Sequence, residues 1–293
     1  MLFSNPARRL MAAASICILS ACSGGSCGSC NAPPIFTPSP APGGIATPTP
    51  LPGATSTPTP GVVPTPTPVP TATPIVALSC AQNAISGGAV PLGSDATVAI
   101  LAGSTITNTG LTTITGDVDV SPGTAYTGFG AGMATVVGGS IHAGDPTAVQ
   151  AQLDLTTAYN NAALRANPLA VPGDIGSMVI APGVYRAPVS LAITGNVTLD
   201  GQNNPNSVFI FQSPSTLTTA TNSTVTLINR ANACNVFWQV ASSATLNTAS
   251  VFNGVILAAA SVSFGTGSTM HGRALASSGA VSLLSNTVTE PAP

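Results

Sequence analysis

The C-terminal part of the chain repeats itself about every 18 residues, and this repeat restricts the folds open to it. Asn-Gly-Val-Ile-Leu-Ala at 253–258 recurs as His-Gly-Arg-Ala-Leu-Ala at 271–276, and related apolar segments stand at 208–211 and 236–239. Because a repeat of this length is too short to enclose a core of its own, each copy has to bury its apolar side chains against the next copy. The repeat therefore predicts a solenoid.

Each repeat holds three short strands, which indicates a triangular β-solenoid. The second strand of successive repeats is expected at 216–219, 245–248, 263–266 and 282–285, and a third follows, as at 223–227. Side chains alternate between the two faces of a strand. We therefore expect these side chains to point inward, one above another: Leu217, Leu246, Phe264 and Leu283. Related strands precede them at 97–102 and 104–109, with Ile106 inward, and near 191, with Leu191 inward.

The same alternation places hydroxyl and amide side chains in outward columns. On the second strand the outward set is predicted to be Thr105, Thr107, Ser190, Thr216, Thr218, Thr245, Asn247, Ser263 and Ser282. Alternating Thr is also ordinary in a solvated strand, but here the hydroxyls return in the same column. Gly265 and Leu284 interrupt the pattern. The first-strand column is bulkier, and the third-strand column is the main competitor, with Thr224, Thr226, Thr269 and Thr287.

One helix is expected between the two halves of the solenoid. Asp145 is a favourable N-cap, followed by Pro146 at the first helical position. The side chains that share one apolar face are Ala151, Leu155, Ala158, Tyr159 and Ala162. The helix is expected to end near Arg165 and to lie against one face of the solenoid.

The N-terminal quarter of the chain carries signals for export rather than for a core. Residues 1–22 contain Arg8 and Arg9, then a short apolar run, then Leu19-Ser20-Ala21-Cys22. This tetrad resembles a bacterial lipobox and predicts a lipidated Cys22, although an ordinary signal peptide cut nearby is the alternative. Residues 23–76 form a linker with fifteen prolines, many alternating with Thr, which favours extended polyproline II. The folded domain is expected over 77–293, exported and held at the cell envelope.

The remaining cysteines divide between linker and domain. Cys80 and Cys234 are the two that fall in the expected folded domain, and export permits a disulfide, so we pair them. Cys27 and Cys30 stand at the start of the linker without a second ligand pair, which argues against zinc.

The charges argue against several classes of function. Only 5% of the residues are charged, Lys is absent, and the net charge is −2, which leaves no basic surface for nucleic acid. Of the two histidines, His142 stands beside Asp145, which we assign to the helix cap, and His271 takes the place of Asn253 in the repeat. Asp117 and Asp119 offer too few oxygens for calcium and are assigned to turns. We therefore expect no enzyme, no metal and no cofactor.

Several stretches together resemble the DUF3494 family of microbial ice-binding proteins. They are Leu101–Gly110, Gly116–Gly123, Ala181–Tyr185, Leu199–Gln202, Val208–Gln212, Asn235–Gln239 and Gly272–Ala276. The resemblance covers nearly all of residues 90–290. It implies a discontinuous right-handed parallel β-helix, mainly β, with one long α-helix packed alongside. It also implies that one flat face binds the planes of ice crystals.

The outward second-strand column fits such a surface. Neighbouring strands lie about 4.7–4.9 Å apart, and alternate residues along a strand about 6.7 Å apart, which resembles repeats between waters in ice. Thr presents a hydroxyl and a methyl on a stiff side chain. We therefore expect a monomer whose partners are ice and, through its lipid, a membrane. The alternative is a noncatalytic cell-surface adhesin or a carbohydrate-binding β-solenoid.

Overall fold

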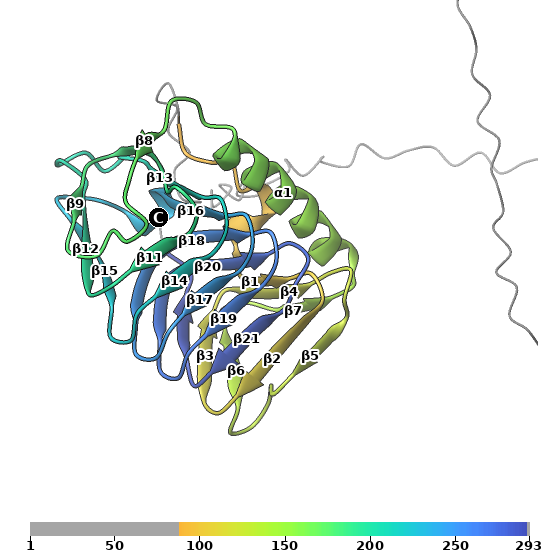
Figure 1. The fold of residues 1–293 in the computed structure, drawn as a ribbon. Coiled ribbons are helices and arrows are strands. Elements are labelled where there is room, and N and C mark those ends of the chain that lie inside the picture. The colour runs from red at the N-terminus through yellow and green to blue at the C-terminus, as the bar shows by residue number, and fades with distance from the viewer. Residues whose placement is uncertain (1–87, 292–293) are drawn as a thin grey trace, which may run out of the picture. The chain divides into compact units, whose positions relative to one another are not determined.

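The computed structural model describes residues 88–291. The expected signal segment, Cys22, the Thr/Pro-rich linker and Cys80 lie outside the described residues. Residues 88–291 form a solenoid, in which the strand pairs are parallel and the chain runs repeatedly around three faces, called a, b and c (Figure 1).

Face a lies under the helix. Its strands are β1 (Val98–Ala102), β4 (Asp117–Val120), β7 (Ile141–Ala143), β8 (Leu169–Ala170), β10 (Gly183–Arg186), β13 (Phe209–Ser213), β16 (Val236–Val240), and the second halves of β18 (Val251–Ala258) and β20 (Thr269–Ala276). β18 and β20 are long because they bend from face c onto face a.

Faces b and c carry the shorter strands. Face b is a seven-stranded sheet in the order β11 (Leu191–Ile193), β14 (Leu217–Thr219), β17 (Ala244–Leu246), β19 (Val262–Phe264), β21 (Val281–Leu284), β2 (Thr105–Thr109) and β5 (Ala125–Thr127). Face c holds β9 (Val179–Ile180), β12 (Asn196–Asp200), β15 (Thr224–Ile228), the first halves of β18 and β20, β22 (Thr287–Thr289), β3 (Thr112–Thr115) and β6 (Ala134–Val137).

The stack of coils does not follow chain order. β1 pairs with β20 on one side and with β4 on the other, and β2 and β3 pair with β21 and β22. The N-terminal coils therefore lie on the C-terminal one. The helix α1 (Pro146–Ala163) carries the chain back along face a, and the later coils fill the space between (Figure 1). The predicted mainly β, discontinuous parallel solenoid with one helix alongside is confirmed.

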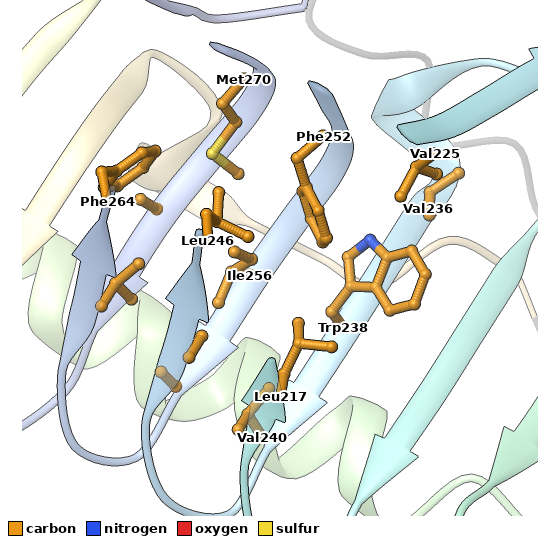
Figure 2. Close-up of a cluster of buried hydrophobic side chains, with 14 of the residues drawn as sticks. Leu217, Val225, Val236, Trp238, Val240, Leu246, Phe252, Ile256, Phe264 and Met270 are labelled. Carbon is orange, nitrogen blue, oxygen red and sulfur yellow. The ribbon is translucent and has the colours of Figure 1, made fainter. Parts of the chain in front are cut away.

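The interior is filled by stacked apolar side chains from successive coils. The four predicted second-strand residues are buried in it, together with Ile106 and Leu191. Phe264 stacks on Leu246 as predicted, but the prediction that Leu217 joins this row is wrong, because Leu217 pairs with Leu191 on one side and with Ala244 on the other. Toward one end Phe211 and Trp238 stack with ring centroids 4.2 Å apart. The ring of Phe252 lies 5.1 Å from that of Trp238 on the other side (Figure 2). Trp238 donates its Nε1–H to the carbonyl oxygen of Asn253 at 3.0 Å, so its one polar group is satisfied.

Helix α1 covers face a along one outward row of residues. Asp145 caps it, accepting the amide hydrogen of Ala148 at 3.0 Å, and the helix buries Ala151, Leu155, Ala158 and Ala162 against the sheet. At its C-terminal end Gln212 donates to the carbonyl oxygens of Ala162, Ala163 and Arg165. These bonds satisfy carbonyls that a helix end leaves unpaired. The predicted N-cap and apolar face are confirmed.

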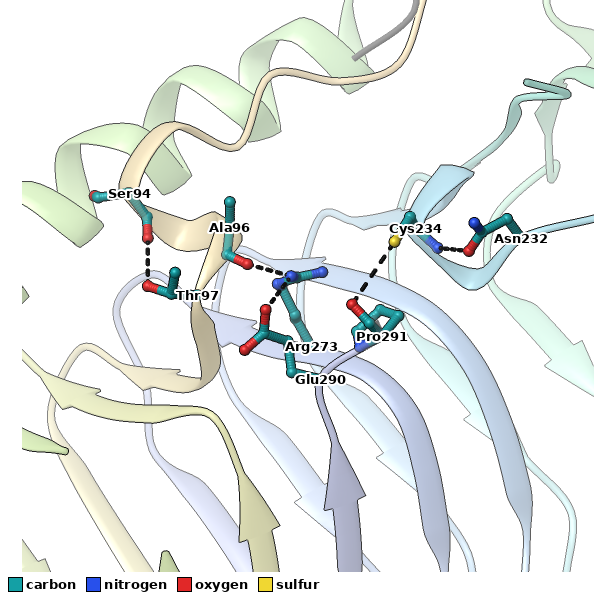
Figure 3. A network of polar contacts seen from close by, with 8 residues as sticks. All are labelled: Ser94, Ala96, Thr97, Asn232, Cys234, Arg273, Glu290 and Pro291. Atoms are coloured by element: carbon teal, nitrogen blue, oxygen red, sulfur yellow. Dashed lines mark hydrogen bonds and ion pairs between the residues drawn. The ribbon is translucent and has the colours of Figure 1, made fainter. Parts of the chain in front are cut away.

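Arg273 closes the junction between the first and last coils. It stands opposite Val255 in the register and is fully buried. Its guanidinium donates to the carbonyl oxygen of Ala96 and pairs with Glu290 at 2.9 Å (Figure 3). Burial raises the pKa of Glu290, while the neighbouring guanidinium opposes that shift.

Candidate functional site

Face b presents a continuous row of small outward side chains, here called the central column. Strand pairing places its seven members one above another: Ala192, Thr218, Thr245, Ser263, Ser282, Thr107 and Thr127. Six of the seven carry a hydroxyl, and those six occupy successive coils. Thr107, Thr127 and Thr218 are exposed and the others half-buried. The described pairs of this sheet show no shift of register, so the column is straight.

A second row, the flanking column, lies two residues earlier in each strand. Its members are Ser190, Thr216, Ser243, Ser261, Ala280, Thr105 and Ala125. The hydroxyl of Thr216 donates to that of Ser190 at 3.2 Å, and in the central column Thr107 donates to Ser282 at 3.3 Å. These contacts join neighbouring coils and limit the rotation of the side chains, which keeps the array in one arrangement.

The structure brings together eight of the nine predicted residues in these two columns. The exception is Asn247, which follows β17 at the edge of the face. Its Nδ2 donates to the carbonyl oxygen of Thr219 at 2.7 Å, and its backbone amide donates to the Thr219 hydroxyl at 2.9 Å. The amide of Asn247 therefore holds the bend between faces b and c and is not a free donor in the array.

Three hydroxyl residues of face b were not predicted from the sequence. Ser243 and Ser261 lie two positions before Thr245 and Ser263, so alternation along the strand was signal enough to find them. Thr127 is different. It pairs with Thr107 in the first turns of the solenoid, whose coils do not follow the 18-residue repeat, and only the pairing of β5 with β2 places it.

Face c also carries threonines but is less uniform. Its outward row in register with Thr224 contains Asn196, Val251, Thr269, Thr287, Thr113 and Thr135, so hydroxyls follow one another over four coils before Val251 interrupts them. His271 is exposed on this face, in register with Asn253 as expected. Val137 and Val179 are exposed there as well. Face a is covered by α1, which leaves face b as the most regular open surface.

Several titratable groups lie near the helix, whereas Asp174 lies at the end of face b, where it bridges to Ala192. His142 contacts Asp145 through Nδ1 and Oδ2 at 2.8 Å, and this bond raises the pKa of His142. The assignment of Asp117 and Asp119 to turns is wrong, since both lie in β4. Asp119 pairs with Leu101 of the neighbouring strand β1. Its side chain therefore belongs to the outward row of face a, which lies under the helix.

Burial shifts two carboxyls strongly. It raises the pKa of Asp119 to about 7 and that of Asp95, in the short 3-10 turn η1 (Gly93–Ala96), to about 9. Neither carboxyl has a hydrogen-bond partner within the described residues. In the same part of the chain no group of three His, Cys, Asp or Glu side chains is placed to hold a metal ion. No helix in residues 88–291 has the length and apolarity needed to cross a membrane.

Comparison with known proteins decides the family. The sequence model of the family described as "Ice-binding-like" matches residues 100–289. The chain belongs to the ice-binding-like family. Its members are non-catalytic, which confirms the prediction that this protein is not an enzyme.

Relatives and solved structures agree with that family. An ice-binding protein of Nostoc sp. (strain HG1) is 43% identical over 217 residues, which cover 73% of this chain and 79% of the relative. A crystal structure of an ice-binding protein from an Antarctic biological consortium matches with a TM-score of 0.67 and 44% identity, over 69% of this chain and 91% of the other. The ice-binding protein of the Antarctic ascomycete Antarctomyces psychrotrophicus matches with a TM-score of 0.65 and 37% identity, over 69% and 98%.

Proposed function

We infer that this protein binds ice crystals, and we propose that face b is the surface that meets the ice. Membership of the ice-binding-like family supports the ligand. The observation that favours face b is its central column, in which a hydroxyl returns on six successive coils without interruption. The residues proposed to bind are those of the two columns, including Thr105, Thr107, Ser190, Thr216, Thr218, Thr245, Ser263 and Ser282.

The hydroxyl columns of face b are regularly spaced and uncharged. Rungs about 4.8 Å apart on a packed core form a rigid array. Such an array can hold water in fixed positions before it meets a crystal, so little further entropy is lost on binding. A charged side chain would hold its own hydration shell. Neither column contains one, and the exposed Asp174 lies beyond the end of the central column, where it bridges to Ala192. Adsorbed molecules of this kind hinder the growth of the crystal between them.

An ice-affinity partition experiment tests the proposal. A crystal is grown slowly from a solution that holds the protein and an inert soluble protein of similar size, and the fraction of each that enters the ice is measured. We expect this protein to enter the ice and the inert one to stay in the liquid. Equal exclusion of both would favour the alternative, a noncatalytic adhesin or carbohydrate-binding solenoid.

Face c is a second candidate surface for the same ligand. What favours it is the run of Thr269, Thr287, Thr113 and Thr135 in register on four coils. Against it stand Val251 and the exposed His271. Bulky substitutions on either face separate the two candidates, because a side chain that stands above a flat surface blocks only the face that carries it.

We further propose that the domain is exported as a monomer and held at the cell envelope by lipid on Cys22, with residues 23–76 as a spacer and the folded domain over 77–293. The tetrad Leu19-Ser20-Ala21-Cys22 and the Thr-Pro repeats support this arrangement. We also propose a disulfide between Cys80 and Cys234. In its support, Cys234 is only 2% exposed and its sulfur is in a disulfide bond.

A further inference from the structure

The central column of face b crosses a seam between segments that are far apart in the chain. The seam is the interface of β21 and β22 in the last coil with β2 and β3 in the first coil (Figure 1). Five rungs of the column stand on one side of it and two, Thr107 and Thr127, on the other. Other neighbouring coils in residues 88–291 are consecutive in the chain, so a bend of the backbone fixes their spacing. At the seam, contacts between the coils have to do this instead.

The last coil makes the corner between faces b and c with one residue fewer than the coils on either side. Residues 262 and 269 of the preceding coil pair with residues 281 and 287. Residues 281 and 287 in turn pair with residues 106 and 113 of the first coil. The missing residue takes a peptide group with it, so hydrogen-bonding groups buried at this corner need another partner.

Asn286 supplies that partner with its side-chain amide. The side chain is only 2% exposed, and its Oδ1 accepts the backbone N–H of Leu284. Its Nδ2 donates to the carbonyl oxygens of Gly265 and Ser268 in the preceding coil, at 2.8 and 3.1 Å. One amide therefore closes the shortened corner and ties it to the coil before.

Thr112 continues this network across the seam. Its hydroxyl accepts the backbone N–H of Asn286 at 3.1 Å and donates to Oδ1 of Asn108. Asn108 in turn donates its Nδ2 to the carbonyl oxygen of Gly128, in the following coil, at 2.8 Å. Thr112 is 2% exposed and Asn108 8%, so water hardly reaches these bonds. The network runs from Ser268 to Gly128 through four successive coils, inside the corner next to face b.

We propose that the bridge between Asn286 and Thr112 positions the ice-binding surface, because it holds the two rungs beyond the seam in one plane with the other five. The proposal rests on face b being that surface. Asn286 lies just past Ser282 in the last coil, and Thr112 lies just past Thr107 in the first coil. A shift between the two coils at the corner is therefore passed to the column. Neither bridge residue touches the ice, since both side chains are inside.

The bridge is the stronger of two side-chain ties at the seam. On the surface, the hydroxyls of Thr107 and Ser282 lie 3.3 Å apart in an exposed bond, which water can replace. The bonds of Thr112 are buried, where a hydrogen bond is electrostatically stronger and polarises its neighbours in the network. A functional surface needs its contact groups held to about 0.5 Å, and the residues behind them supply that precision.

Thr112→Val and Thr112→Ser separate the hydroxyl of the bridge from the packing of its methyl group. Val keeps the shape and removes both hydrogen bonds, whereas Ser keeps the hydroxyl and removes the methyl. The backbone amides of Thr113 and Ser285 donate across the seam, each at 2.9 Å, and report on it by hydrogen exchange. In Thr112→Val their protection should fall by a factor of at least about five, and in Thr112→Ser it should stay at the parent value.

Thermal hysteresis is measured on the same variants near the melting point of ice, with Tm measured separately to show that each is fully folded there. Thr112→Val should lose at least the share of the column that leaves the plane, two of its seven rungs. Thr112→Ser should match the parent. A role in stability alone would lower Tm without lowering the hysteresis of the folded protein.

Ser250→Ala is the matched control. Ser250 occupies the position of Asn286 two coils earlier and is 1% exposed. Its hydroxyl donates to the carbonyl oxygen of Asn247 in its own coil at 2.7 Å. The substitution removes a buried corner hydroxyl without touching the seam, so it should lower Tm and leave seam protection and hysteresis unchanged.

Two results would overturn the proposal. If Thr112→Val is folded and keeps the parent hysteresis, the bridge supports the fold alone. Equal losses in Thr112→Ser and Thr112→Val would show that the methyl group and not the hydroxyl is essential. Should Thr112→Val fail to fold, Asn286→Ser decides by the same measurements, because Ser250 and Ser268 show that this position accepts serine. We expect it to lose seam protection and hysteresis, and parent values of both would refute the bridge.

Seam protection is measured without ice, so the two proposals can fail separately. Full hysteresis in Thr245→Tyr would refute face b as the ice-binding surface, and with it the positioning role. Loss of protection in Thr112→Val would still support the bridge as the tie between the first and last coils.

Discussion

A tyrosine placed in the central column of face b is the sharpest test of the proposed surface. Thr245 is the third of seven positions in that column and is half-buried with its side chain outward. A ring at this position stands above its neighbours and holds a flat crystal off by at least one carbon contact distance, about 3.5–4 Å. Thr245→Tyr and Thr218→Tyr should therefore lose activity while the fold stays intact.

The size of the effect follows from the geometry of the column. Seven rungs at about 4.8 Å span about 29 Å. A rigid plane that rests on an obstacle at the third rung can touch only one far edge of the column, because neither ice nor a packed core yields. Contact over most rungs is lost, so thermal hysteresis should fall by more than about half. Surface substitutions change the free energy of unfolding by less than about 0.5 kcal/mol, which for a domain of this size shifts Tm by about 1–2 °C.

The assay measures thermal hysteresis and Tm on the same samples, with Thr226→Tyr on face c as the matched control. Thr226 is half-buried in the middle of β15, so the added ring is the same and only the face differs. We expect the control to keep full activity. If both face b variants stay folded and fully active while Thr226→Tyr loses activity, then face c is the binding surface and our reasoning is wrong.

Three further predictions concern the anchor, the disulfide and the buried acids. The mature protein should begin at Cys22 and partition into detergent, and mass spectrometry that finds an unmodified N-terminus elsewhere would contradict this. Cys80→Ser should leave Cys234 reactive to a thiol reagent after unfolding and lower the free energy of unfolding by a few kcal/mol, about 2–4, whereas labelling of both cysteines in the unreduced parent would exclude the pair. Asp95 has its pKa raised to about 9 by burial, so between about pH 4 and 9 it is protonated when folded and ionised when unfolded, and its contribution to stability declines as pH rises. The free energy of unfolding then falls by at most about 1.4 kcal/mol per pH unit. Asp95→Asn should flatten the fall of Tm between pH 5 and 9. An unchanged dependence of Tm on pH would show that Asp95 is ionised in the folded protein.

Local patterns were enough to predict the elements that depend on near neighbours. The 18-residue repeat places Phe264 above Leu246, because each coil packs on the next one in sequence. Asp145 and Pro146 set the start of α1 through bonds within one turn. The export signals and the linker are likewise matters of composition and order along the chain.

Contacts between distant segments were settled only by the tertiary structure. Thr107 and Ser282 are 175 residues apart, yet their hydroxyls lie 3.3 Å from each other because the first coil stacks on the last. Asp119 is buried under α1 for the same kind of reason, since the row that passes beneath the helix runs through coils from both ends of the chain. The sequence by itself determined that the chain forms stacked coils with hydroxyls on their outward positions. Which coils are neighbours, and therefore how long the hydroxyl column on face b is, depended on pairing between strands that no local pattern connects.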